Sequence, residues 1–452
     1  MKTIFYCGLF NQFHVHFLKS LICNNKDIKE IIVVTNGFKL KSQDKIKITY
    51  IEYNDILKFK LPNQIISDFD ILNFSSDELF NSLKMMDRLH EIESKSFESR
   101  IEILFKYAGF WNKIFENKKI DFAIFHNRPH DVFDYIAQCV LTLLNTKTYC
   151  FFQTNIMGYY EVINLNKNKK IKIHDQINNN DKIRFNNVIS KYKNQDLVPF
   201  YLKKKSKKIL FRVKLIGFIK SLKILGFSKI LQLLLSFIKS KSKKLIIKIY
   251  LNRISIEPNL NENFIFVPLH FQPELTTCPT GGIKVYQEKM IKNLHSILPK
   301  NWKIYVKEHP KQNLSTNRSL SFYKKIISLP NVEFVDINFN SYELLNKSRV
   351  VSVITGTLGF EAIVNSIPTF VFGNVLFKNA PNVINFKKNM NLEKISNELR
   401  EKVNKEMILN YLNEQHLFLK QGYSDPLYSA QVEIDYDLNI ANLVQIISEK
   451  MA

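Results

Sequence analysis

The chain has 452 residues, of which 45% are hydrophobic and 23% charged, so it can bury a sizeable core and is not a disordered protein. The net charge of +24 is concentrated, because 16 Lys and Arg and no Asp or Glu lie between residues 197 and 255. The rest of the chain carries only about +8, which does not indicate a nucleic-acid-binding fold.

The five cysteines form no C-x-x-C pair, so neither a disulfide framework nor a zinc site is expected. A reducing cytoplasm is the predicted location. The first ten residues read as a strand and a turn, and they lack the features of a signal peptide. No stretch reaches about 18 uncharged apolar residues, so no transmembrane helix is expected.

Short apolar runs alternate with helical patterns in the first half of the chain. Buried strands that alternate with helices predict a parallel sheet covered on both faces. The Asn- and Lys-rich stretch Asn164–Asp196 is predicted to be a loop or linker. The expected elements are strands at Thr3–Cys7, Ile31–Thr35, Phe122–Phe125 and Thr148–Phe152 and a helix at Val132–Leu144.

The basic segment predicts two amphipathic helices with a break near Gly226. Basic helices with Leu and Ile faces are typical of the surface of anionic membranes, and the alternative is a pair of helices packed on the protein. Nucleic acid fits less well, because few aromatic side chains are present to stack on bases. The predicted membrane-binding residues are Arg212, Lys220, Lys223, Lys229 and Lys239.

A second alternation of strands and helices follows the basic segment, and it ends in a mostly helical tail. The predicted architecture is therefore α/β, with two Rossmann-like domains facing a cleft and the basic segment inserted between them. The expected elements are strands at Phe264–Pro268, Trp302–Val306, Val332–Val335, Arg349–Ile354 and Thr369–Phe372 and helices at Gln287–Leu298, Tyr342–Lys347 and Leu358–Asn365. The expected boundaries are 1–195 for the first domain, 196–258 for the basic segment, 259–390 for the second domain and 391–452 for the C-terminal helices.

The first motif lies at the end of a strand and reads Lys307, Glu308, His309 and Pro310, and all four residues are candidate donor contacts. His309 can donate a hydrogen bond to a phosphate oxygen, and Lys307 adds positive charge. The alternative is an ordinary turn in which the proline ends the strand.

The second motif joins a β-branched run to a helix and contains Thr355, Gly356, Thr357 and Glu361. Free N–H groups at the start of the helix and two threonine hydroxyls make an anion site. The motif lacks the Lys-Ser/Thr pair of a P-loop and is not G-x-G-x-x-G, which disfavours ATP hydrolysis and a standard dinucleotide site. Glu361 is placed to reach ribose hydroxyls, unless it is an exposed helix acid.

The third motif is the long loop after the first strand of the second domain. It is rich in Pro and Gly, and such a loop at the carboxyl end of a strand suits substrate contacts, although its prolines also serve simply to fix its path. The candidate donor contacts in it are His270, Gln272, Glu274 and Thr276.

These three motifs, in this order and spacing, resemble the nucleotide-sugar half of bacterial capsule and surface polysaccharide biosynthesis proteins, which are glycosyltransferases of the GT-B fold. The resemblance covers Phe264–Gly373, about a quarter of the chain. The His309-Pro310 pair is similar to the motif of GT-B enzymes that use CMP-activated sialic acid or Kdo. The resemblance implies that His309 holds the CMP phosphate, with Thr355, Gly356 and Thr357 beside it.

The catalytic group of a GT-B enzyme usually comes from its first domain. Transfer of a sugar requires a base for the acceptor hydroxyl, or a nucleophile. The stretch from His126 to Asp134 follows a strand and opens a helix, so His130, Asp131 and Asp134 are the leading candidates, with Glu161 second. Asp131 has a simpler reading as a helix cap.

No metal site is predicted. The triplets Asp68-Phe69-Asp70 and Asp435-Tyr436-Asp437 resemble the metal-binding pair of GT-A enzymes, but neither lies near a phosphate motif. His14 and His16 lie in the loop after the first strand and can face the cleft, and they make a weak metal pair because no carboxylate is close.

The predicted function is transfer of a sugar from a nucleotide-activated donor, CMP-sugar preferred, onto a surface or capsular glycan or lipid-linked acceptor, without a required cofactor. The enzyme is expected in the cytoplasm, peripherally bound to the inner membrane, with no nucleic acid as partner. Three alternatives stay open at this stage. They are a CDP-alcohol phosphotransferase of the teichoic-acid type, a non-catalytic membrane scaffold of polysaccharide assembly, and a nucleotide-sugar epimerase.

Overall fold

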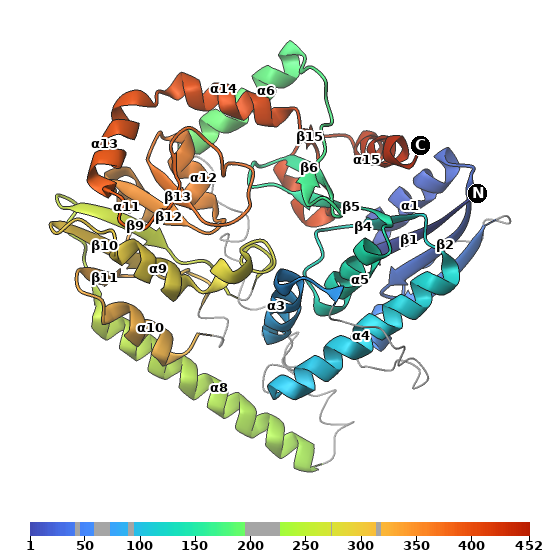
Figure 1. Ribbon diagram of the computed structural model, residues 1–452, viewed down its shortest axis with the longest axis horizontal. Helices are drawn as coiled ribbons and strands as arrows, with labels where there is room; N and C mark the ends of the chain where they lie inside the picture. Colours follow the sequence, from blue (N-terminus) through green and yellow to red (C-terminus); the bar gives the residue numbers. More distant parts are fainter. Residues whose placement is uncertain (41–45, 58–72, 89–94, 195–226, 273, 313–317) are drawn as a thin grey trace.

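The computed structural model describes residues 1–40, 46–57, 73–88, 95–194, 227–272, 274–312 and 318–452. These residues form two sheets, one of eight strands and one of seven, and each sheet is covered by helices on both faces (Figure 1). The predicted α/β class with two Rossmann-like domains is confirmed.

The first domain is built from residues before the basic segment. Its strands are β1 (Lys2–Leu9), β2 (Ile28–Thr35), β3 (Lys47–Glu52), β4 (Phe122–Phe125), β5 (Lys147–Gln153), β6 (Tyr159–Asn164) and β7 (Lys169–Lys170). Its helices are α1 (Gln12–Asn24), α2 (Tyr53–Leu57), α3 (Ser76–Met85), the short η2 (Met86–Arg88), α4 (Phe97–Lys118) and α5 (Val132–Leu143).

The second domain follows the long helix α8 (Phe227–Ile254). Its strands are β8 (Ser255–Ile256), β9 (Asn263–Pro268), β10 (Trp302–Lys307), β11 (Val332–Val335), β12 (Val350–Val353), β13 (Thr369–Val371) and β14 (Val383–Ile384). Its helices are η4 (Gly282–Val285), α9 (Gln287–His295), α10 (Leu320–Ile327), α11 (Ser341–Lys347), α12 (Thr357–Val364), α13 (Leu392–Lys402) and α14 (Lys405–His416).

Both sheets have the doubly wound strand order. The parallel part of the first sheet runs β3-β2-β1-β4-β5, and the second runs β11-β10-β9-β12-β13-β14. In each sheet the order of the strands reverses beside one central strand, which is β1 in the first sheet and β9 in the second. Sheets of this kind bind their ligands at this reversal point, at the carboxyl ends of the strands. Two such domains in one chain are the GT-B-like arrangement.

The strands form where the sequence places fully buried apolar runs. Four consecutive residues of β9, Phe264–Val267, have no exposed surface, and the same is true of almost the whole of β2 from Ile31 to Val34. A strand that is buried on both faces reads as a continuous apolar run, because helices cover both sides of the sheet. The predicted strands in both halves therefore coincide with observed strands.

The C-terminal segment returns to the first domain. Helices α13 and α14 pack on the second domain, and then β15 (Leu419–Gln421) pairs antiparallel with β6. After the short η6 (Pro426–Gln431), the last helix α15 (Tyr436–Met451) packs against α1 (Figure 1). The helical segment expected from residue 391 therefore also contributes a strand to the first sheet.

The prediction of a loop or linker over Asn164–Asp196 is wrong for much of its length. The stretch contains β7 and the helix α6 (Asn179–Lys193), which lies beside α12 and α14 on the second domain (Figure 1). Asn178 caps α6 by accepting a hydrogen bond from the Asp181 N–H. Phe185, Ile189 and Tyr192 form its buried face, so three apolar residues suffice to fix this helix.

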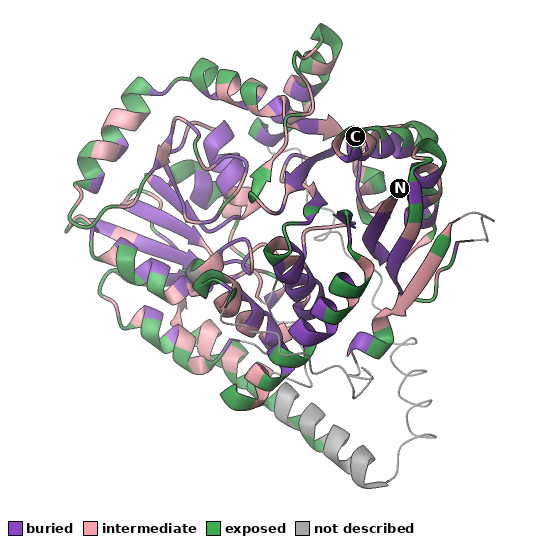
Figure 2. Cartoon of the chain, turned by 45° about the vertical axis from the view of Figure 1, so that its right-hand side comes forward, coloured by how far each residue is buried: buried purple, intermediate pink, exposed green. Residues whose placement is uncertain are grey.

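Helix α8 begins one residue after the break that was predicted near Gly226. Residues 195–226, with the predicted membrane residues Arg212, Lys220 and Lys223, lie outside the described residues. Lys229 and Lys239 lie in α8. The end of α8 packs on the second domain through Ile247, Tyr250, Leu251 and Ile254 (Figure 2).

Candidate functional site

The donor side is organised by a hydrogen bond across the reversal point of the second sheet. His270 follows β9, and Thr355 follows β12. The Thr355 N–H donates to Nε2 of His270 over 3.0 Å, so the ring proton is on Nδ1, which is buried without a partner among the described residues. Burial, and then the nearby Arg318 and His309, lower the pKa of His270 to about 3, so this ring is neutral.

The phosphate-binding loop predicted at Thr355–Thr357 lies against this histidine. A Cβ atom at Gly356 would stand 3.0 Å from Nε2 of His270, so the glycine is needed for the ring itself to approach. Thr355 is buried, and its hydroxyl donates to the Thr276 carbonyl oxygen over 2.6 Å. Helix α12 starts at Thr357 without a side-chain cap; the Gly359 N–H donates to the Gly356 carbonyl oxygen over 3.0 Å, and the N–H groups of Thr357 and Leu358 before it are placed for an anion.

His309 follows β10, the strand next to β9. Its Nδ1 accepts from the Lys311 N–H over 3.2 Å, so Nε2 carries the proton. Burial lowers the pKa of His309 to about 4, with Glu308 opposing the shift and Arg318 adding to it. The ring is therefore a neutral hydrogen-bond donor. Lys307, the last residue of β10, is buried, which lowers its pKa, and Pro310 is exposed.

Glu308 is placed differently from the prediction. Its side chain is 3% exposed and forms an ion pair with Arg318, and the Tyr323 hydroxyl donates to its Oε2 over 2.6 Å. Its Oε1 also accepts from the His309 N–H over 2.6 Å. All of this holds Glu308 inside the domain, so it positions His309 and does not face the donor.

The remaining loop candidates make contacts within the loop. The Gln272 side chain donates to the Val285 carbonyl oxygen over 2.7 Å, and its N–H donates to Gln312. The Thr276 hydroxyl donates to the Glu274 carboxylate over 2.8 Å. These bonds fix the conformation of the loop. The loop contacts the phosphate-binding motif through the Thr276 carbonyl oxygen, which accepts from the Thr355 hydroxyl.

Glu361 is not an exposed helix acid. It is 4% exposed, and its Oε2 is buried without a partner among the described residues. Burial raises the pKa of Glu361 to about 8, and a hydrogen bond with Tyr342 opposes that shift.

This pKa predicts a pH dependence of stability. Between about pH 4.5 and 8 the folded chain keeps a proton on Glu361 that the unfolded chain has lost, so the free energy of unfolding is expected to fall by about 1 kcal/mol per pH unit as pH rises through this window. Urea unfolding across the pH range measures it. Glu361→Gln should remove this contribution, and equal pH dependence of the variant and the wild type would contradict the prediction.

The first domain contributes the segment after β4. Asp131 occupies the N-cap position of α5 but makes no capping hydrogen bond. Because that hydrogen bond is missing, the interpretation of Asp131 as a helix cap is wrong. The residue is half-buried. Asp134 is buried, its Oδ2 accepts from the His130 N–H over 3.3 Å, and its Oδ1 has no partner among the described residues. Burial, and then the charge of Asp131, raise the pKa of Asp134.

The ring of His130 donates from Nδ1 to the Arg128 carbonyl oxygen over 2.8 Å, since a carbonyl only accepts. Glu161 lies on β6 opposite Phe152 and Leu419, where burial raises its pKa. It sits within the sheet and not in the segment after β4, so Asp131 is the best-placed of the three candidate carboxylates.

The prediction that His14 and His16 lie in the loop after the first strand is wrong, because both lie in α1, and the pairing of His14 with His126 was missed. The rings of His14 and His126 lie 4.9 Å apart, and Nδ1 of His126 donates to the Cys7 carbonyl oxygen over 3.1 Å, which leaves Nε2 as the acceptor. Gly8 has φ of +140°, and a Cβ there would stand 2.2 Å from the His126 ring. Glycine is scarce in this chain, with 12 residues, so Gly8 directly after a predicted strand was the sequence feature that pointed to a close contact here.

Two contacts join the domains beside these groups. Arg88 donates to the carbonyl oxygens of His130 and Cys278, and the Asn155 side chain donates to the Thr355 carbonyl oxygen over 3.4 Å. The loop after β4 is thereby tied to the donor loops of the second domain. The two sets of predicted residues face one another across this junction.

Among the described residues, no group of three His, Cys, Asp or Glu side chains could hold a metal ion. Asp435 caps α15 by accepting from the Leu438 N–H, whereas Asp68 and Asp70 lie outside the described residues. His16 contacts the Tyr436 hydroxyl over 2.8 Å.

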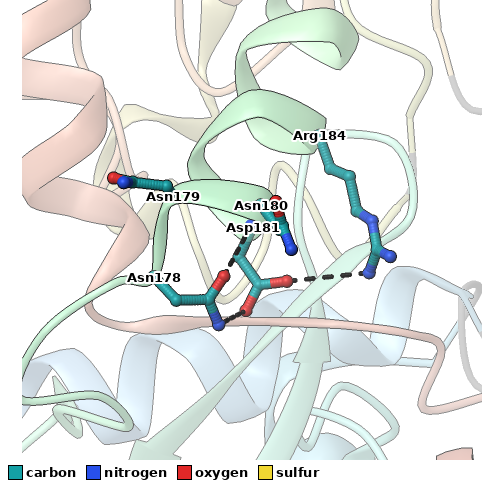
Figure 3. Close-up of a pocket in the computed structure, with 5 residues that line it drawn as sticks. All are labelled: Asn178, Asn179, Asn180, Asp181 and Arg184. Carbon is teal, nitrogen blue, oxygen red and sulfur yellow. Dashed lines mark hydrogen bonds and ion pairs between the residues drawn. The ribbon is translucent and has the colours of Figure 1, made fainter.

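A surface hollow at the start of α6 is not part of the site (Figure 3). It is lined by Asn178–Asp181 and Arg184, and these side chains bond with one another as a helix cap. Polar groups that are already paired leave little for a ligand.

Comparison with known proteins bears on the second domain. Residues 252–412 match the family model described as capsule polysaccharide biosynthesis protein. The match includes the whole stretch, Phe264–Gly373, on which the sequence resemblance rested.

Among solved structures, the chain is similar to KpsC, β-Kdo 2,7 transferase, of Thermosulfurimonas dismutans, with 13% identity, 83% of this chain and 97% of that chain covered, and a TM-score of 0.33. It is similar to Anabaena Alr3699/HepE in complex with UDP, with 10% identity, 99% and 100% covered, and a TM-score of 0.30. It is similar to the UDP-GlcNAc 2-epimerase of Neisseria meningitidis bound to UDP-GlcNAc, with 13% identity, 100% and 99% covered, and a TM-score of 0.23. Likenesses this low do not bear on the substrate. No curated protein matches the sequence.

Proposed function

We propose that this capsule polysaccharide glycosyltransferase takes its sugar from a CMP-activated donor and adds it to a glycan or lipid-linked acceptor at the inner face of the membrane. The observation that carries the proposal is the set of neutral donors at the reversal point of the second sheet. In the proposed site, one phosphate accepts hydrogen bonds from Nε2–H of His309, the Thr357 hydroxyl and the first N–H groups of α12.

This set of donors suits a nucleoside monophosphate as the leaving group. Both histidines are neutral, so neither of them offers positive charge to a diphosphate. A single phosphate gains enough from neutral N–H and O–H donors and the dipole of the helix. Glu361, one turn into α12, is the proposed ligand of the ribose hydroxyls.

In the transfer step, Asp131 accepts the proton of the acceptor hydroxyl as its oxygen bonds to the anomeric carbon of the sugar. The bond from that carbon to the CMP phosphate oxygen breaks, and the electron pair stays on the phosphate. His309 donates to the oxygen on which this charge builds up. The enzyme then acts mainly by placing the acceptor and by stabilising the leaving group, and the proposal requires no cofactor.

The identity of the donor nucleotide is tested by measuring the melting temperature of the protein with CMP, CDP, UDP, GDP and ADP in turn. CMP at 100 times its Kd should add about 2.7 kcal/mol of stability. His309→Ala should weaken CMP binding about 10- to 100-fold, because it removes a hydrogen bond to a charged group. His295→Ala is the matched control, since His295 ends α9 and leads back to the opposite edge of the sheet.

Selectivity for UDP or GDP would replace the donor, and a preference for CDP would favour the CDP-alcohol phosphotransferase. No response to any nucleotide, in the presence of acceptor and membrane, would favour the scaffold. Retention of CMP affinity in His309→Ala would remove His309 from the site.

Membrane association is supported by the exposed face of α8. Leu235, Ile238, Leu245, Ile246 and Ile249 are each 55–59% exposed, and at 100° per residue they lie within a stripe about 100° wide. Lys241, Lys244 and Lys248 follow along one side of the stripe. An apolar stripe beside a row of lysines is typical of a helix that lies in the surface of an anionic membrane. Among the described residues, no helix is long and apolar enough to span one.

Co-sedimentation with vesicles measures this proposal. The wild type should bind vesicles of mixed neutral and anionic lipid and be released by high salt. Exchange of Leu245 and Ile249 for Asp should weaken binding about 100-fold or more, because it loses two buried apolar side chains and adds two negative charges. Asn252→Asp, an exposed change on the same helix outside the stripe, is the control. Equal binding of the wild type and the double variant would contradict it.

A further inference from the structure

A cavity of about 200 Å³ lies between the two domains, apart from the groups proposed to hold the donor. The first domain lines it with Lys84, Asp87 and Arg88. The second domain lines it with the loop around Cys278 and Tyr286 and with the start of α10. The function proposed above makes no use of this cavity.

Arg88 lies in its wall, where the carboxylates of Asp131, Asp134 and Glu274 act on its charge without an ion pair. The two terminal nitrogens donate to the carbonyl oxygens of His130 and Cys278, while Nε is buried without a partner among the described residues. Within the described part of the chain, no carboxylate forms an ion pair with it. A buried cation that forms no ion pair is costly, so an anion in the cavity would offset part of that cost.

Arg318 lines the cavity from the other domain. It is 4% exposed, and its terminal nitrogens are used by Glu308 and by the His270 carbonyl oxygen. Its Nε is also buried without a partner among the described residues. Two arginine side chains from different domains thus line one cavity, and each has a buried Nε without a partner among the described residues.

The other charges of the lining leave a positive balance. Asp87 is paired with Lys84 over 2.6 Å and with Arg100 over 2.8 Å, so its charge is already met. Lys325 lies exposed on α10 at the rim, and Glu288 is the other acid of the lining. Four basic side chains therefore face two acidic ones.

We propose that this cavity is a second anion site, which takes a carboxylate or phosphate group between Arg88 and Arg318. Arg88 also holds the backbone of His130, and Arg318 holds His270 and the glutamate that positions His309. An anion bound to both arginines therefore holds the two halves of the site together. The acidic group is either part of the glycan acceptor, as an acidic sugar or a phosphate ester, or it is free phosphate.

Calorimetric titration with inorganic phosphate tests the site, at constant ionic strength and in a His309→Ala background that weakens the donor pocket. Phosphate should still bind there. Lys325→Glu should weaken it about tenfold by reversing one charge at the rim. Lys324→Glu is the matched control, because Lys324 is its exposed neighbour on α10 and does not line the cavity, and it should change the affinity less than about twofold. Arg88→Gln should abolish binding.

Titration with glucuronate separates the two sources, because tighter binding of glucuronate than of phosphate would indicate an acidic sugar. No binding of either up to about 50 mM, or equal weakening by Lys325→Glu and Lys324→Glu, would overturn the proposal. The outcome is independent of the proposed donor. CMP binding depends on His309, and phosphate binding in the cavity depends on Lys325 and Arg88.

Discussion

Replacing Asp131 by asparagine is expected to lower kcat about 10²- to 10⁴-fold while leaving CMP affinity unchanged. The residue occupies the N-cap position of α5 without a capping hydrogen bond, so its carboxylate is not used by the helix. An amide of the same shape keeps the packing and loses the ability to accept the proton. Product formation with acceptor and donor measures kcat, and calorimetry measures the affinity.

Asp134→Asn is the matched control on the same helix. Burial and the charge of Asp131 raise the pKa of Asp134, and an amide mimics the protonated form of a carboxyl group. We expect this variant to keep turnover within about tenfold of the wild type. The opposite ranking of the two variants would assign the base to Asp134. Full activity of both would leave His126, whose Nε2 is unprotonated, as the group to replace next.

The fold was predictable because its strands carry their signal locally. A strand such as β9 is buried on both faces and must be apolar throughout, so its sequence alone reveals it. Strand β6 was missed because two tyrosines and Glu161 interrupt that pattern. Helix α6 was missed because only Phe185, Ile189 and Tyr192 mark its buried face within a polar segment.

The donor motifs were predictable for a similar reason, since each follows a strand directly. Their side-chain contacts were not. Arg318 lies 10 residues after Glu308 in sequence and forms an ion pair with it, and Arg88 reaches a carbonyl 190 residues away. Contacts of this kind depend on how loops return to the sheet, and a single sequence does not record them.

Glu308 is the residue whose role was predicted wrongly because its long-range contacts could not be predicted. A charged residue between a lysine and a histidine, just after a strand, was read as a donor contact. In the structure its carboxylate is enclosed by Arg318, Tyr323 and the His309 N–H. Its effect on the donor is therefore indirect, through the position of the histidine, and this difference can be measured.

Glu308→Ala is expected to destabilise the protein by about 3–5 kcal/mol, because it leaves Arg318 as a buried cation without its partner. Denaturant unfolding measures the loss. The double variant Glu308→Gln with Arg318→Met removes both charges while roughly keeping the volume, and it should recover most of this stability. Tyr323→Phe removes one hydrogen bond to the same carboxylate and should cost about 1–2 kcal/mol.

The double variant also separates packing from positioning. If Glu308 acts through His309, the recovered protein should still bind CMP more weakly than the wild type, because the N–H of His309 donates to a neutral amide instead of a carboxylate. A merely structural role predicts that CMP affinity returns together with stability. A double variant as unstable as Glu308→Ala would show instead that the ion pair contributes through its geometry, and that the core around Tyr323 does not tolerate an apolar replacement.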